Sequence, residues 1–220
     1  MQPVAHKDLS FKRVSADEIP ETKPKAGWSN IRTIDLGMAD GKAISFLFYS
    51  KDIQNAEADV QAFFQYEGKL YDYELGLLPY RLSEVEANKV DGSFDDQVVL
   101  AGTGTTLTHW NVIVFDKTSH KLRSFRTVGR PKLIDLDSDG QKELVASFEG
   151  AHLHFPNVEI IRYHDGELES AQVIESQNSD NPEFARLVRQ SSDFVIEIGK
   201  AREEKAPQRF AYKDGRLTAL

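Results

Sequence analysis

The amino-acid sequence predicts an all-β protein, organised as a propeller-like array of about four four-stranded blades. Three observations support this fold class: similar hairpins recur along the chain, the segments between them are short and rich in β-branched and aromatic residues, and glycine-containing turns separate them. With Leu70, Leu122, Leu168 and Leu217 as anchors, the successive spacings are 52, 46 and 49 residues, a period typical of propeller blades. The alternative is a β-sandwich whose hairpins resemble one another by coincidence.

The hairpins have closely related sequences. Three of them place an acidic residue and a glycine where a tight turn requires positive φ: Glu67-Gly68, Asp165-Gly166 and Asp214-Gly215. A longer match relates residues 111–115 to residues 157–161, at an offset of 46. Each repeat therefore has room for four strands.

We assign the strands from these anchors. In the first repeat we expect strands at 30–36, 42–49, 60–66 and 69–75, and in the third at 131–136, 143–149, 157–163 and 167–173. One repeat alone buries only one face of a small sheet, so stacked repeats are needed to form a core. We therefore expect a single repeat domain over residues 28–220. Residues 1–27 are rich in Lys, Glu and Pro with little apolar periodicity, which predicts a flexible N-terminal tether.

Residues 133–145 contain the most specific motif of the chain, an acidic loop between two strand-like runs. Carboxylates recur at alternate positions, and Gly140 allows the chain to turn sharply. The expected ligands are the carboxylates of Asp135, Asp137, Asp139 and Glu143 and the backbone carbonyl of Gln141. A hard cation prefers such an all-oxygen site, so the loop predicts bound Ca²⁺. The alternative is an acidic turn without metal.

The pattern Asp-x-Asp-x-Asp-Gly-x-x-Glu over residues 135–143 resembles the calcium loop of integrin-type FG-GAP and VCBS repeats. Strand-like runs flank it, and the closing acid stands at position 9, whereas helical calcium hands close at position 12. The resemblance implies a divergent member of this family, with a β-propeller scaffold used for adhesion, recognition or ligand binding. The motif itself presents no open coordination position for chemistry, so we expect the calcium to have a structural role, holding the connection between two strands.

Composition excludes several classes of function. The net charge of −8 and the pI near 5.3 argue against nucleic acid as a partner, because such proteins need a positive surface. No apolar stretch approaches the roughly 20 residues of a transmembrane helix. The absence of cysteine removes thiol catalysis, disulfides and zinc ribbons.

The calcium loop and the tether together favour an exported protein at the cell surface or outside the cell. Extracellular modules can use weak calcium sites because calcium is plentiful there. No signal peptide is visible, so we expect a mature domain, for example a lipoprotein whose N-terminal anchor precedes Met1. A cytoplasmic location stays open.

The motifs favour a binding module over an enzyme, since neither Gly-x-Ser-x-Gly nor cysteine is present. Two equivalent loops are the candidate contacts for a protein or cell-surface ligand, through Thr106 and Trp110 in one and His152 and His154 in the other. Trp110 has an alternative role in capping a blade edge. The alternative function is a metal-dependent hydrolase, in which His152, His154 and His109 hold zinc or copper.

Overall fold

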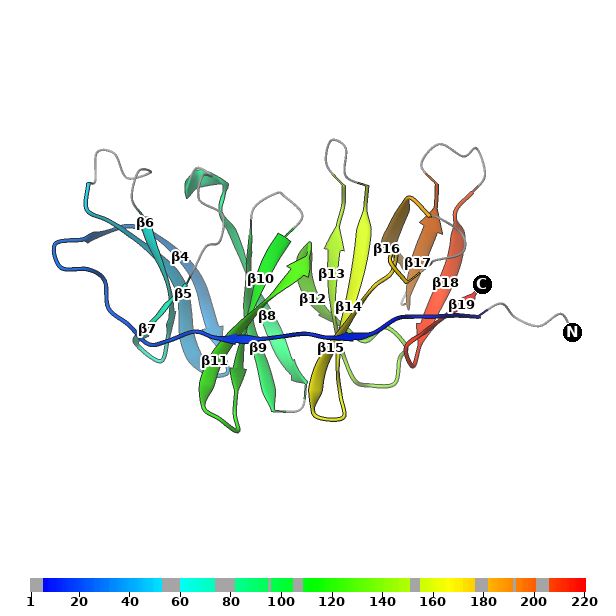
Figure 1. Cartoon of the computed structure of the whole chain (residues 1–220), viewed down its shortest axis with the longest axis horizontal. Helices are drawn as coiled ribbons and strands as arrows, with labels where there is room; N and C mark the ends of the chain where they lie inside the picture. The colour runs from blue at the N-terminus through cyan, green and yellow to red at the C-terminus, as the bar shows by residue number, and fades with distance from the viewer. Residues whose placement is uncertain are drawn as a thin grey trace, which may run out of the picture. The chain divides into compact units, whose positions relative to one another are not determined.

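The structure is a computed structural model that describes residues 6–52, 60–73, 82–94, 96–104, 109–150, 155–176, 182–191, 193–200 and 206–220. The regular structure of this described part is β-strand, with no α-helix and a single 3₁₀ turn, η1(Leu82–Glu84). Its strands form four antiparallel sheets of four or five strands (Figure 1). The prediction of an all-β protein is therefore confirmed.

Each sheet contains four strands that follow one another along the chain. The first sheet consists of β4(Ser29–Ala39), β5(Lys42–Ser50), β6(Val60–Tyr66) and β7(Lys69–Asp72). The four consecutive strands of the second sheet are β8(Glu86–Phe94), β9(Gln97–Gly104), β10(His109–Asp116) and β11(Lys121–Val128), and those of the third are β12(Arg130–Ile134), β13(Glu143–Phe148), β14(Asn157–His164) and β15(Glu167–Gln172). Those of the fourth are β16(Phe184–Gln190), β17(Asp193–Gly199), β18(Gln208–Lys213) and β19(Arg216–Ala219). Each of these three sheets also contains a fifth, N-terminal strand. The predicted strands of the first and third repeats are confirmed to within three residues at each end.

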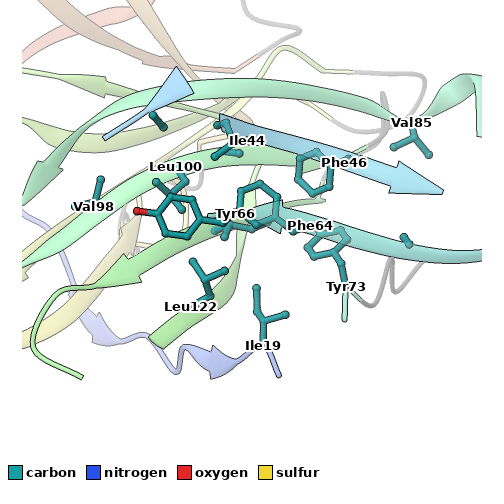
Figure 2. Close-up of a cluster of buried hydrophobic side chains, with 14 of the residues drawn as sticks. Ile19, Ile44, Phe46, Phe64, Tyr66, Tyr73, Val85, Val98, Leu100 and Leu122 are labelled. Atoms are coloured by element: carbon teal, nitrogen blue, oxygen red, sulfur yellow. The ribbon is translucent and has the colours of Figure 1, made fainter. Parts of the chain in front are cut away.

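The chain divides into two compact units, each with its own core. One unit comprises Ala16–Thr106 and Asn111–Phe125, and its core contains residues of the first two sheets. Alternate residues of β5 lie on one face, so Phe46 and Phe48 are both buried. The Phe46 ring lies 5.1 Å from that of Phe64 and 5.2 Å from that of Tyr73 (Figure 2). These contacts account for the many aromatic residues of the first repeat.

The second unit comprises Met1–Ser15, Leu107–Trp110 and Arg126–Leu220. Its core contains mostly aliphatic residues of the third and fourth sheets, among them Val145, Val158, Ile160, Ile196 and Ile198, together with the aromatic Phe210. Short β-branched side chains on alternate positions fill the space that such strands leave on their buried face. This unit also contains the acidic loop.

The N-terminal segment differs from the flexible tether expected for residues 1–27. Its described part contains three short strands, β1(His6–Asp8), β2(Lys12–Arg13) and β3(Asp17–Glu18), drawn in blue in Figure 1. They pair antiparallel with β19, β15 and β11, respectively. A further bridge joins Glu21 to Tyr71 in β7. The last strand of every sheet is thus paired with one N-terminal segment, which covers an otherwise open edge.

Apolar anchors explain why this segment is held. Leu9 and Ile19 are buried, with 7% and 5% of their surfaces exposed. Leu9, Val14 and Ile19 follow one another at intervals of five residues. This spacing fits neither a regular helix nor a regular strand. The segment therefore lacks the periodicity from which structure is predicted, although it contributes to both cores.

Candidate cation site

The acidic loop joins the end of β12 at Ile134 to the start of β13 at Glu143. One carboxylate oxygen each of Asp135, Asp137 and Asp139 lies within 4.8 Å of the others. The turn that brings them together places Ser138 at φ 59° and Gly140 at φ 90°. Within the described residues, this is the one group of three or more acidic or histidine side chains close enough to share a cation.

Backbone amides fix the orientation of two of these carboxylates. Asp139 N and Gly140 N donate to the two oxygens of Asp135, at 3.2 and 3.1 Å. Gln141 N donates to Oδ1 of Asp139 at 2.7 Å. Three backbone hydrogen bonds therefore hold the two carboxylates in fixed orientations. The loop is therefore preorganised around negative charge.

Asp137 has an oxygen that the described protein atoms leave without a hydrogen-bond partner. Its Oδ1 is buried, whereas Oδ2 accepts a 3.4 Å hydrogen bond from the backbone amide of Asp214. A buried carboxylate oxygen without a partner is costly, and a bound cation would remove that cost. The residues present therefore fit a hard cation, which Asp135, Asp137 and Asp139 would hold.

Glu143 is buried at the end of the loop. Its Oε2 accepts a 3.0 Å hydrogen bond from the amide of Leu136. Burial, followed by the negative charges of Asp137 and Asp139, raises the pKa of Glu143 to about 7. The structure thus brings three of the five predicted ligands together, places Glu143 against the loop backbone, and leaves Gln141 exposed with its amide on Asp139.

Two residues of the neighbouring hairpin also belong to the surroundings of the loop. Asp214 lies in the β18–β19 turn, and Tyr212 is buried in β18. Burial first, and then the negative charges of Glu143 and Asp137, raise the pKa of Tyr212 to about 12. Sequence reasoning identified the Asp214-Gly215 turn as a repeat feature but not its contact with the loop. No signal in a single sequence pairs residues 77 positions apart.

The predicted partner-binding residues have different outcomes. Thr106, His152 and His154 lie outside the described residues, so the zinc or copper alternative rests largely on positions that the structure does not describe. Trp110 is buried, with 4% of its surface exposed, and the guanidinium of Arg130 lies 4.8 Å from its ring. Its carbonyl accepts a hydrogen bond from the Thr127 hydroxyl at 3.4 Å. This favours a packing role for Trp110.

Comparisons with protein families, with curated proteins and with solved structures found no match to this chain. Among the described residues, no helix has the length and apolar character needed to cross a membrane.

Proposed function

We propose that this chain is a calcium-stabilised, extracytoplasmic binding module on a β-propeller-like scaffold. The observation that carries the proposal is the convergence of Asp135, Asp137 and Asp139, with one buried Asp137 oxygen that lacks a partner among the described residues. All-oxygen donors of this kind are the ligands that hard divalent cations prefer. The carbonyl of Gln141 and the carboxylate of Glu143 are the remaining ligands that we propose.

Calcium suits these residues better than magnesium does. Calcium accepts six to eight oxygen ligands in flexible geometry, including backbone carbonyls, whereas magnesium demands a near-ideal octahedron and usually keeps several waters. A single loop with carboxylates at alternate positions supplies many oxygens but little freedom to build an octahedron. The bound ion would offset the repulsion between the carboxylates, which supports a structural role in holding the connection between β12 and β13.

The propeller-like scaffold is proposed from the repetition of one sheet plan. Four consecutive strands form an antiparallel meander in every sheet, and the order is the same each time. This plan, at a period of about 50 residues, is the pattern of propeller blades. In such scaffolds the loops make contacts while the sheets hold them in place. We propose the segment 151–156 as a contact region, supported by Phe155, of whose surface 46% is exposed.

Isothermal titration calorimetry of calcium and magnesium into the full chain, freed of metal with EDTA, tests the cation site. We expect one calcium per chain and weaker heat with magnesium. Asp137→Asn should abolish the calcium heat. Asp35→Asn is the matched control, because Asp35 lies in β4, where its Oδ1 accepts a 2.8 Å hydrogen bond from Gly37 N, and it is outside the acidic cluster. Calcium binding unchanged in Asp137→Asn, or absent from the wild type, would contradict the proposal.

A further inference from the structure

The N-terminal strap, defined as residues 6–22, contains a five-residue repeat whose copies contact the fourth, third and second sheets in turn. Leu9, Val14 and Ile19 hold equivalent positions in successive repeats. Their backbone amides donate to the carbonyls of Gly215, Leu168 and Leu122, at 3.1, 2.8 and 2.9 Å. Thr22 N donates likewise to the carbonyl of Leu70 at 2.9 Å. In each sheet, therefore, a backbone amide of the strap donates a hydrogen bond to a backbone carbonyl in or next to the last strand.

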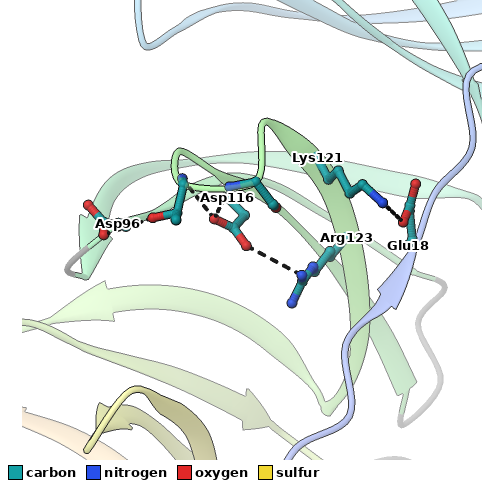
Figure 3. A network of polar contacts seen from close by, with 7 residues as sticks. Glu18, Asp96, Asp116, Lys121 and Arg123 are labelled. Atoms are coloured by element: carbon teal, nitrogen blue, oxygen red, sulfur yellow. Dashed lines mark hydrogen bonds and ion pairs between the residues drawn. The ribbon is translucent and has the colours of Figure 1, made fainter.

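The strap also forms one ion pair with the last strand of each sheet, in the same sheet order as the hydrogen bonds. Asp8 pairs with Arg216 at 2.9 Å, and Arg13 pairs with Glu167 at 3.2 Å. Glu18 pairs with Lys121 at 2.5 Å, as Figure 3 shows, and Glu21 pairs with Lys69 at 2.9 Å. The four partners share one property, because each is the first residue of the last strand of its sheet: Lys69 in β7, Lys121 in β11, Glu167 in β15 and Arg216 in β19.

The order of signs fixes the register of the strap. Along the strap the paired charges are negative, positive, negative and negative, and Glu167 is the one acidic partner among basic ones. A slip of one repeat in either direction would place Arg13 beside Lys121 or Arg216, and an acidic strap residue beside Glu167. Exposed pairs contribute little to affinity, but like charges at two positions disfavour the wrong register. The order of charges therefore selects a strap sequence with this order of signs, in this register on the four last strands.

Apolar contacts supply the affinity that the ion pairs lack. Leu9 and Ile19 are buried. Phe11 adds a cation–π contact, because the guanidinium carbon of Arg162 lies 3.8 Å from the centre of its ring. Main-chain hydrogen bonds, apolar anchors and selective charges are the three components of peptide recognition by strand addition to a sheet edge. In each unit, the edges of the last strands thus recognise the part of the strap that pairs with them.

We propose that these sheet edges also bind a second copy of the chain, whose N-terminal strap replaces the resident one. A second copy supplies the same repeat, anchors and order of charges. The connection to β4 contains Pro24 and Gly27, and Gly27 has φ +80° with no heavy atom near its Cβ position, so it can serve as a hinge. Each strap contact is the same within one chain or between two. The proposal does not depend on the cation site.

Two full-length variants with reversed charges test the exchange. The strap-reversed variant carries Asp8→Arg, Arg13→Glu, Glu18→Lys and Glu21→Lys, and the sheet-reversed variant carries Lys69→Glu, Lys121→Glu, Glu167→Arg and Arg216→Asp. Within either variant all four pairs repel, but each strap matches the sheets of the other variant. We expect native mass spectrometry of the mixture, after incubation in mild denaturant, to show heterodimers at least about tenfold above homodimers. Two monomeric variants that stay monomeric on mixing would overturn the proposal.

A chain that combines all eight reversals is the control, because it restores every pair internally. It should melt close to the wild type and form no heterodimer with either parent above the wild-type level. If an eightfold or fourfold variant does not fold, the single reversals Arg13→Glu and Glu167→Arg repeat the test at one pair. A smaller but selective preference for the mixed dimer would then support exchange, and random pairing would contradict it.

Discussion

The backbone amide of Asp214 donates a 3.4 Å hydrogen bond to Oδ2 of Asp137, which connects the β18–β19 turn to the acidic loop between β12 and β13. The other oxygen of Asp137 is buried and has no hydrogen-bond partner among the described residues. A cation bound to that oxygen would restrict the Asp137 side chain and, through it, the turn. The loop and the last hairpin should therefore respond together to calcium.

Hydrogen exchange at the Asp214 amide measures this response. We expect calcium to slow its exchange by about tenfold, because opening the turn would also require Asp137 to move from the cation. The amide of Asp165 is the control, since it occupies the equivalent turn of the third sheet. Slowing at both amides to the same extent would indicate general stabilisation and not the specific link.

The elevated pKa of Glu143 predicts an unusual pH dependence of stability without metal. In the folded chain the pKa is about 7, above the ordinary value of 4.5, so the folded state retains a proton that the unfolded state loses first. The stabilisation is complete below about pH 4.5 and is lost as pH rises through 7, by up to about 3 kcal/mol. Urea unfolding in EDTA at pH 5 and pH 8 measures the free energy of unfolding.

Glu143→Gln separates this effect from other titrating groups. The side-chain amide of the introduced glutamine does not ionise between pH 5 and pH 8. The free energy of unfolding should therefore decline less over this range than in the wild type. The wild type in saturating calcium should also lose the decline, because the cation favours the ionised carboxylate. An equal decline in the variant would assign the pH dependence to another residue.

Gly129 joins the second and third sheets in the sequence, where no larger residue fits. A Cβ at this position would lie 2.3 Å from the backbone carbon and oxygen of Ser147, and its φ is +96°. The preceding amide, Val128 N, also donates to buried Glu159 at 2.7 Å. We expect Gly129→Ala to lower the free energy of unfolding by about 3 kcal/mol or more. Gly68→Ala should cost about 1 kcal/mol, because φ is also positive there but the space is open.

Ile19 provides a direct test of whether the N-terminal segment is a structural part of the fold. Only 5% of its surface is exposed, so Ile19→Ala should destabilise the chain by about 2–4 kcal/mol through a cavity in the core. Ser15→Ala, at an exposed position of the same strap, should change stability by less than about 0.5 kcal/mol. A flexible tether would make the two variants indistinguishable in thermal unfolding.

The strands were predictable because their signals are local. Turn pairs such as Asp165-Gly166 and alternating apolar residues define each hairpin, and the anchors Leu122 and Leu168 set the repeat. The same holds for the loop carboxylates, since alternate positions around Gly140 converge whatever surrounds them.

The remaining features depend on contacts between distant parts of the chain. The strap has a five-residue period because it meets a different sheet with each repeat, and this period has meaning only once the sheets are formed. Trp110 looks like a contact residue in sequence, but Arg130 covers its ring. The buried environment of Glu143, which sets its pKa, likewise requires the folded chain.

Thermal unfolding of the full chain and of Asp137→Asn, each in EDTA, millimolar calcium and millimolar magnesium, tests the calcium site most directly. At calcium tenfold above Kd the stabilisation is about 1.4 kcal/mol, which corresponds to a rise in Tm of about 3–6 °C for a chain of this size. We expect this rise for the wild type in calcium, a smaller one in magnesium, and none for Asp137→Asn. Equal Tm values for the wild type in EDTA and in calcium would contradict the account and identify the loop as an acidic turn.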